Sequence, residues 1–114
     1  MSADRLPAHL EVASILRRAE ATGGFGTVLR KGDPDRGSIM LAVTSRGDHR
    51  ALLERVLACD GDYQWQRSGP SESAGSAQIA DFLARRARFD ADSWLIELDI
   101  ADAERFIAET TSTG

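Results

Sequence analysis

The amino-acid sequence predicts an α+β fold, with a mostly antiparallel five-stranded sheet and helices packed on one face. Five segments have the alternating or continuously apolar pattern of strands, and three carry apolar residues every three or four positions, as helices do. Their order along the chain is α-β-β-β-β-α-β-α. A length of 114 residues with 42% hydrophobic residues is typical of one globular domain. We therefore expect residues 1–114 to form a single domain, with 1–6 and 110–114 flexible.

Each predicted helix has a start signal, an apolar stripe or both. Pro7 suits the first turn of the first helix, and the segment Thr22–Gly24 is expected to stop that helix. Ser76 is expected to cap the second helix, which stops near residues 89–92, and Asp102 is expected to cap the third. The apolar residues are Val12, Ile15, Leu16 and Ala19 in the first helix, Ile79, Phe82 and Leu83 in the second, and Phe106 and Ile107 in the third. Asp81 and the arginines of the second helix, Arg86 among them, are expected to face outward.

The first two strands are expected to form a hairpin. Two β-prone runs between Gly24 and Thr44 flank the segment Asp33–Gly37. Pro34 fixes its own φ, the aspartates can bond nearby amides, and glycine can take positive φ, so this segment favours a turn. A calcium loop would need more oxygen ligands at alternate positions, which argues against a metal site here.

The segment Arg50–Cys59 fits both a helical stripe and a strand. The dipeptide Asp60–Gly61 is a strong hairpin signal, and the alternating segment Tyr63–Gln66 follows it, so we favour a strand and a second hairpin. The segment Ser93–Asp99 is nearly continuously apolar, which is typical of a strand in the interior of a sheet.

Composition excludes several classes of function. A net charge of −4 argues against non-specific nucleic-acid binding, which needs a dense basic surface. No apolar run approaches the roughly 20 residues of a membrane span, and the first residues lack the apolar core of a signal peptide. Cys59 is the single cysteine, so an intramolecular disulfide cannot form. We expect a cytoplasmic protein without a membrane partner.

Several stretches resemble one protein family. The relevant segments are Ile15–Ala19, Gly24–Phe25, Val28–Asp33 with Gly37, and Arg88–Leu98. They are similar to the bacterial domain-of-unknown-function family 1491, whose members are small single-domain proteins found mainly in alphaproteobacteria. The resemblance covers roughly Leu10 to Phe106. It implies the same fold class and a bacterial cytoplasm, and it implies no activity, ligand or catalytic residue.

Four carboxylates near the end of the chain could carry chemistry. Asp90 and Asp92 lie beside Trp94, so they could hold a cation or an amine. We favour a structural interpretation, in which Asp90 binds backbone groups at a helix-to-strand corner and Phe89 and Trp94 pack inward. Glu97 and Asp99 share one face of a predicted strand. Together the four define an alternative function, a small metal-dependent hydrolase.

Basic and aromatic residues define two further candidate sites. Two arginine clusters would form one patch for phosphate, nucleic acid or acidic protein if their helices pack side by side. These clusters are Arg17 and Arg18 in the first helix and Arg85, Arg86 and Arg88 in the second. Tyr63 and Trp65 could stack on the bases of a single-stranded nucleic acid. Solvated helix surface is the favoured interpretation of the arginines, and one aromatic pair on an acidic protein is weak support for nucleic-acid binding.

The leading functional hypothesis is a non-catalytic protein-binding module. The sequence predicts no catalytic residue, metal or cofactor, because His9, His49 and Cys59 have no partners at ligand or catalytic spacing. The partner is expected to be another protein, bound through the sheet face or an edge hairpin. A homodimer formed by extension of the sheet edge is a further expectation.

Overall fold

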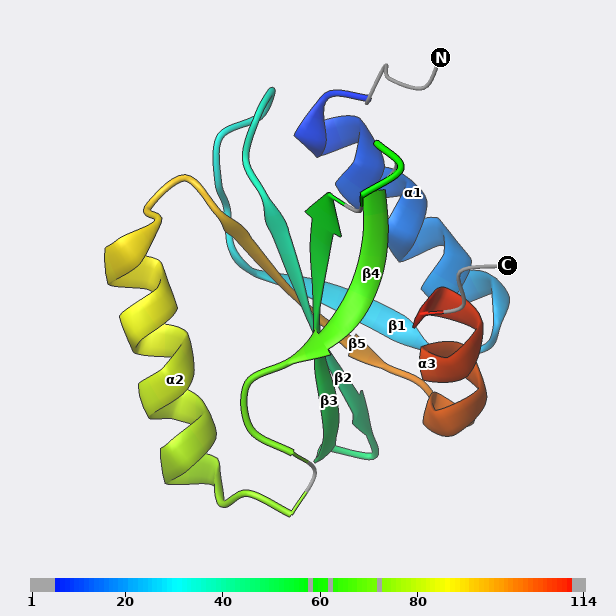
Figure 1. The fold of residues 1–114 in the computed structure, drawn as a ribbon. Coiled ribbons are helices and arrows are strands. Elements are labelled where there is room, and N and C mark those ends of the chain that lie inside the picture. Colours follow the sequence, from blue (N-terminus) through cyan, green and yellow to red (C-terminus); the bar gives the residue numbers. More distant parts are fainter. Residues whose placement is uncertain (1–5, 58, 62, 72, 112–114) are drawn as a thin grey trace.

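The computed structural model describes residues 6–57, 59–61, 63–71 and 73–111, and Figure 1 shows their fold. The order of elements is the predicted one. Along the described chain they are α1 (Ala8–Ala21), β1 (Phe25–Arg30), β2 (Ile39–Ser45), β3 (Asp48–Leu57), β4 (Tyr63–Ser68), α2 (Ser76–Phe89), β5 (Trp94–Asp99) and α3 (Ala103–Thr111). The predicted flexible ends lie largely outside the described residues, but Thr110 and Thr111 belong to α3.

The five strands form one mixed sheet in the order β1-β5-β2-β3-β4. Strand β5 pairs parallel with β2, and every other pairing is antiparallel, so the α+β class and the interior position of β5 are confirmed. The expected hairpin between β1 and β2 is wrong, because β5 lies between these two strands. Alternation of apolar residues identifies a strand but does not say which strand lies beside it.

Two hairpins form elsewhere. The hairpin between β3 and β4 is the predicted one, with Asp60 and Gly61 in the turn region. The hairpin between β2 and β3 was not predicted, and it closes through Arg46 and Gly47, whose φ values are +54° and +84°. Two successive positive φ values are characteristic of the tight turns that match the twist of paired strands. The strand assignment of the ambiguous segment 50–59 is confirmed through Leu57.

Helices lie on both faces of the sheet. Figure 1 shows α1 and α3 together on one side and α2 alone on the other, so the expectation of one helical face holds for two of the three helices. The main core lies beneath α1 and α3. Strand β2 requires cover on both faces, because its first six residues, Ile39–Thr44, are all buried. The core side chains come from β2, β3, β5, α1 and α3 and include Val12, Ile15, Leu41, Leu53, Trp94, Ile96, Leu98, Phe106 and Ile107.

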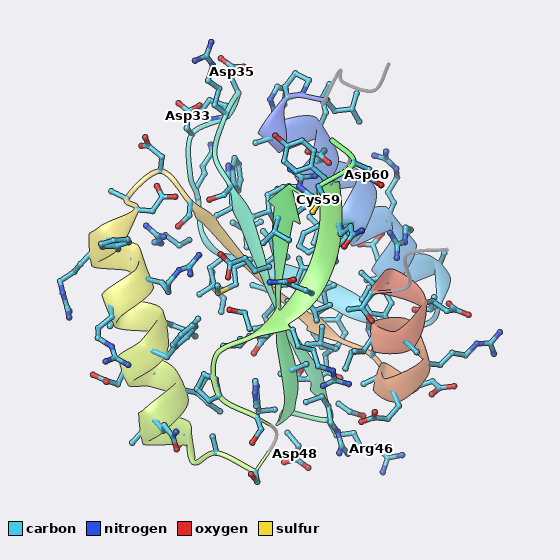
Figure 2. All side chains as sticks on the ribbon, viewed as in Figure 1. Asp33, Asp35, Arg46, Asp48, Cys59 and Asp60 are labelled. Carbon is cyan, nitrogen blue, oxygen red and sulfur yellow. The ribbon has the colours of Figure 1, made fainter. Side chains whose placement is uncertain are left out.

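The loop between β1 and β2 caps the start of α1. The carboxylate of Asp33 accepts hydrogen bonds from the amides of Asp35 and Arg36, at 3.1 and 2.7 Å, so the predicted turn is confirmed. The carbonyl of Asp35 accepts the amide of Ala8 at 3.1 Å, which satisfies a donor that the helix itself leaves unpaired. Figure 2 shows Asp33 and Asp35 at one end of the molecule and Arg46 at the opposite end.

The same loop is held tightly against the start of β5. The amide of Asp33 donates to the carbonyl of Asp92 at 2.9 Å, and the indole N–H of Trp94 donates to the carbonyl of Asp33 at 2.8 Å. Glycine is required at Gly32 and Gly37, because a Cβ there would lie 2.2 and 2.4 Å from the carbonyl oxygen of Asp92. This contact fixes the position of β5 between β1 and β2.

We expect Gly37→Ala to lower the free energy of unfolding by about 1–3 kcal/mol, because backbone atoms cannot move away from the new methyl group as a flexible side chain would. Gly75→Ala is the matched control, since a Cβ at Gly75 meets nothing within 4 Å. Its effect should stay below about 1 kcal/mol. Urea denaturation of both variants measures the difference, and equal losses would contradict the proposed close approach.

Candidate functional site

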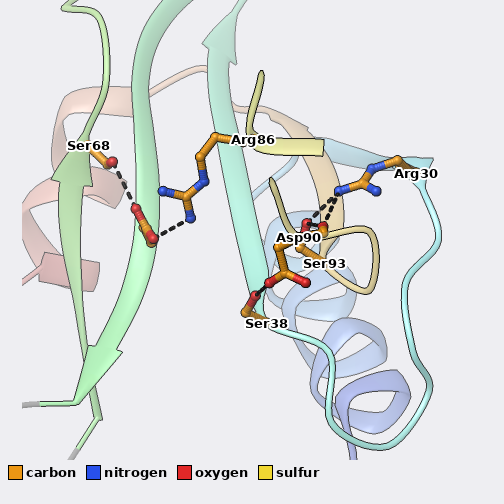
Figure 3. A network of polar contacts seen from close by, with 7 residues as sticks. Arg30, Ser38, Ser68, Arg86, Asp90 and Ser93 are labelled. Carbon is orange, nitrogen blue, oxygen red and sulfur yellow. Dashed lines mark hydrogen bonds and ion pairs between the residues drawn. The ribbon is translucent and has the colours of Figure 1, made fainter. Parts of the chain in front are cut away.

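The corner between α2 and β5 is a structural junction built on Asp90 (Figure 3). One carboxylate oxygen of Asp90 accepts the amide of Asp92 at 3.2 Å, and the other accepts the hydroxyl of Ser38 at 3.0 Å. The amide of Asp90 donates to the carbonyl of Arg86 at 2.9 Å and closes the helix. Trp94 is buried as expected, but Phe89 is 90% exposed, so its expected inward packing is wrong. Phe89 is the last residue of α2, where the chain has already left the sheet face.

Arg30 ties the edge strand β1 to this corner. Its guanidinium group donates to the carbonyls of Ala91 and Asp90, at 3.2 and 3.4 Å, and to the hydroxyl of Ser93. The hydroxyl of Ser93 in turn donates to the carbonyl of Asp90 at 2.8 Å. Sequence analysis missed Arg30, because its partners are mainly backbone carbonyls about sixty residues away.

The four carboxylates of the hydrolase hypothesis do not gather in one place. Asp90 and Asp92 lie at the start of β5, Glu97 lies within that strand, and Asp99 is its last residue, next to the turn between β2 and β3. Across the described residues, no group of three or more His, Cys, Asp or Glu side chains is arranged to hold a metal ion. The four groups therefore do not share a site.

Asp99 organises the tight turn between β2 and β3. Its two carboxylate oxygens accept the amides of Arg46 and Gly47, each at 3.0 Å, and the hydroxyl of Thr44 at 3.2 Å. The hydrogen bond from the Arg46 amide is the main cause that lowers the pKa of Asp99 below its usual 3.8, with burial opposing it and the Gly47 amide and Thr44 hydroxyl reinforcing it. Asp99 is therefore an acceptor that must stay ionised, which suits a structural role.

The two arginine clusters lie on opposite faces of the sheet, so they do not form the single patch that was considered. In α1, Arg18 donates to the hydroxyl of Thr110 at 3.2 Å and lies over the ring of Phe106, 5.4 Å from its centroid. It therefore fastens α1 to α3. Its neighbour Arg17 is exposed on the same helix.

In α2, Arg86 points toward the sheet and Arg85 and Arg88 point away from it. Arg86 forms an ion pair with Glu54 of β3, and the hydroxyl of Ser68 donates to the same carboxylate at 2.9 Å (Figure 3). Arg85 makes an exposed ion pair with Asp81 at 3.6 Å within the helix. Arg86 is thus the one member of this cluster that connects α2 to the sheet.

The two aromatic rings on β4 contact an arginine side chain of the protein itself. The guanidinium of Arg55 lies over the rings of Tyr63 and Trp65, 5.3 and 5.6 Å from their centroids. Arg55 forms an ion pair with Glu11 of α1, and the two side chains are only 8% and 20% exposed. One oxygen of Glu11 and one nitrogen of Arg55 are buried without a hydrogen-bond partner in the protein. The aromatic pair therefore helps to bury this ion pair, and Arg55 covers one face of each ring.

Strand β1 presents the most apolar exposed edge in the described structure. It lies at the end of the sheet and pairs with β5 alone. The side chains of Phe25, Val28 and Leu29 are 62%, 39% and 51% exposed, and Phe25–Leu29 contains no charged residue. This edge was not predicted from the sequence, because the strand order, and therefore which strands lie at the ends of the sheet, was not predicted. Among the described residues, no helix is long and apolar enough to cross a bilayer.

Asp99→Asn tests the turn. We expect a loss of about 1.5–3 kcal/mol of unfolding free energy at neutral pH, since hydrogen bonds to a charged acceptor are lost. The pKa of Asp99 is lowered in the folded state, so its contribution is complete above the unfolded value and disappears as pH falls through the folded value. The difference in unfolding free energy between wild type and variant should therefore shrink below about pH 4. A gap independent of pH in urea titrations would contradict this role.

A double-mutant cycle tests the buried ion pair. Glu11→Leu leaves the charge of Arg55 buried and should cost about 3–5 kcal/mol, whereas Glu11→Leu combined with Arg55→Met should cost clearly less. The exposed pair Arg85–Asp81 is the matched control, and its coupling should stay below about 1 kcal/mol. Additive losses in the first cycle would show that the two charges do not depend on each other.

Known proteins share this architecture. A family model described as a protein of unknown function (DUF1491) matches residues 6–108. The crystal structure of a DUF1491 family protein from Caulobacter crescentus CB15 has 30% sequence identity and a TM-score of 0.79, with 90% of this chain and 94% of that chain covered. An NMR structure of a DUF1491 family protein from the same organism has 30% identity and a TM-score of 0.73, with 89% and 91% covered.

A third solved structure is also similar to this chain. The solution structure of protein Atu0922 from A. tumefaciens has 25% identity and a TM-score of 0.66, with 84% of this chain and 86% of that chain covered. The search of curated proteins gave no match. The resemblance seen in the sequence is thus confirmed by the family model and by structure, and the chain belongs to the DUF1491 family.

Proposed function

We propose that this protein is a non-catalytic protein-binding module that associates through the edge of β1, and that its partner is a second copy of the same chain. The observation that supports this is the exposed apolar edge formed by Phe25, Val28 and Leu29. An edge strand carries a row of outward N–H and C=O groups that can pair with another strand. Exposed apolar side chains on the same strand add area that favours association.

The opposite edge of the sheet is less suited to pairing. Strand β4 reads Tyr-Gln-Trp-Gln-Arg-Ser, and α3 lies against it. Strand β1 cannot pair with a partner strand equally well along its whole length. A register shift falls between Val28 and Arg30, and Lys31 follows the strand. Bulges and lysines discourage pairing, so they restrict the proposed contact to the regular segment Phe25–Val28.

The distribution of charge favours an antiparallel arrangement of the two copies. The C-terminal end of β1 carries Arg30 and Lys31. Beside its N-terminal half, β5 places Glu97 opposite Thr27, whereas the carboxylate of Asp99, opposite Phe25, is bound to the turn between β2 and β3. Antiparallel pairing brings the basic end of one copy toward the acidic end of the other, whereas parallel pairing brings the two basic ends together. The resulting dimer is two-fold symmetric, with one sheet running through both copies.

Analytical ultracentrifugation over a concentration series tests this proposal. The wild type should shift from 12.4 kDa toward twice that mass as concentration rises. Thr27→Lys places like charges opposite each other near the two-fold axis and should weaken dimerisation at least about tenfold. Gln66→Lys adds the same charge to the opposite edge and should leave dimerisation unchanged.

Two results would overturn the proposal. A wild type that stays monomeric at every concentration excludes a second copy as the partner. A dimer that is weakened by Gln66→Lys and not by Thr27→Lys places the contact at β4 instead of β1.

A further inference from the structure

Helix α2 is attached to the sheet more loosely than the other two helices. It has no buried residue, whereas α1 buries Ala8, Val12, Ile15 and Ala19 and α3 buries Ala103, Phe106 and Ile107. The inward-facing side chains of α2 are only half-buried; they are Ile79, Phe82, Leu83, Arg86 and Ala87. Elements with few buried apolar groups open at lower free energy than the core of a domain.

The sheet surface under α2 is nevertheless apolar. Met40 and Ala42 alternate along β2 with residues of the main core, and Leu52 pairs with Ala42 from β3. All three are buried. A pocket of about 20 Å³, room for a single water molecule, remains between Met40 of this surface and Leu83 of α2. The contact between α2 and the sheet is therefore incomplete.

The two ends of α2 are fastened differently. Its C-terminal end is fixed by the hydroxyl of Ser38, which donates to Asp90, and by Arg30, which donates to Ser93 (Figure 3). Arg30 also donates to the carbonyl of Ala91. At the N-terminal end the cap residue is Gly75, which has no side chain to accept a helix amide, so the expected cap by Ser76 is wrong. The connection from β4 begins at Gly69 and passes through Pro70 and serines. The firm end can serve as a hinge and the other as the end that moves.

One charged contact holds the middle of α2 to the sheet. Arg86 pairs with Glu54, which also accepts the hydroxyl of Ser68. An apolar contact lies nearby, because a Cβ at Gly69 would come within 2.7 Å of the ring of Phe82. Arg86 and Glu54 remain 35% and 22% exposed, so both can be hydrated when they separate.

We propose that α2 is a hinged lid, which swings open as a unit about the Asp90–Ser93 corner and is latched by the ion pair between Arg86 and Glu54. Opening uncovers the apolar sheet surface formed by Met40, Ala42 and Leu52. Burial of this surface returns the lid to the closed state. The latch and the surface that the lid uncovers lie on β2 and β3, away from the segment Phe25–Val28 of β1, although Arg30 of β1 helps to fix the hinge.

Native-state hydrogen exchange in low concentrations of denaturant tests the lid. Once detached from the sheet, a helix of 14 residues is marginally stable in water and unravels. The amides of α2 should therefore exchange through one common opening that depends on denaturant, while β5 exchanges only by global unfolding. Glu54→Gln should raise the exchange rates of α2 about ten- to a hundredfold, since a hydrogen-bonded charged pair is lost. The amides of Ser93 and Trp94 at the hinge should keep their protection.

The controls separate a latch from general destabilisation. Asp81→Asn removes the exposed ion pair with Arg85 on the same helix and should change the exchange of α2 less than about threefold. Arg86→Gln removes the latch from the other side and should reproduce the effect of Glu54→Gln. Exchange of α2 only by global unfolding, or equal acceleration of α2 and β5 in both latch variants, would overturn the proposal.

Discussion

The insertion of β5 between β1 and β2 is the constraint on which the rest of the structure depends. Ile96 and Leu98 of β5 are completely buried, and the strand is hydrogen-bonded on both sides. Its start is set by the contact with the loop after β1, where Trp94 donates to the carbonyl of Asp33 and where Gly37 lies too close to Asp92 to carry a side chain. The same loop supplies carbonyls to the first amides of α1, so one contact positions the sheet and a helix together.

Both proposed properties of the molecule follow from this topology. Because β5 takes the place beside β2, β1 moves to the edge of the sheet with Phe25, Val28 and Leu29 exposed. Because β5 is parallel to β2, the chain must return to the same end of the sheet before β5 begins, and α2 makes this return on the face opposite to α1 and α3. The exposed edge and the lightly packed crossover helix thus both result from the order of the strands in the sheet.

The most conspicuous polar residues stabilise the fold. Asp90 closes a corner, Asp99 holds a turn with two positive φ values, and Arg55 is enclosed by aromatic rings and Glu11. A carboxylate that accepts backbone amides has its charge balanced by those donors, so its ionised form is favoured and its affinity for a proton falls. In a sequence, such residues look like catalytic or ligand-binding candidates. Residue type and spacing do not reveal whether the partners of a side chain are backbone groups or a ligand.

Local properties of this protein were readable from the amino-acid sequence. The helices, the turn at Asp33, the hairpin at Asp60 and the buried indole of Trp94 follow from periodicity, turn chemistry and apolar character, which act over a few neighbouring residues. The tertiary structure alone decided which strands are neighbours, which face each helix covers and which edge stays open. Those outcomes depend on contacts between residues such as Arg30 and Ala91, sixty-one positions apart, and on close packing that no short stretch of sequence encodes.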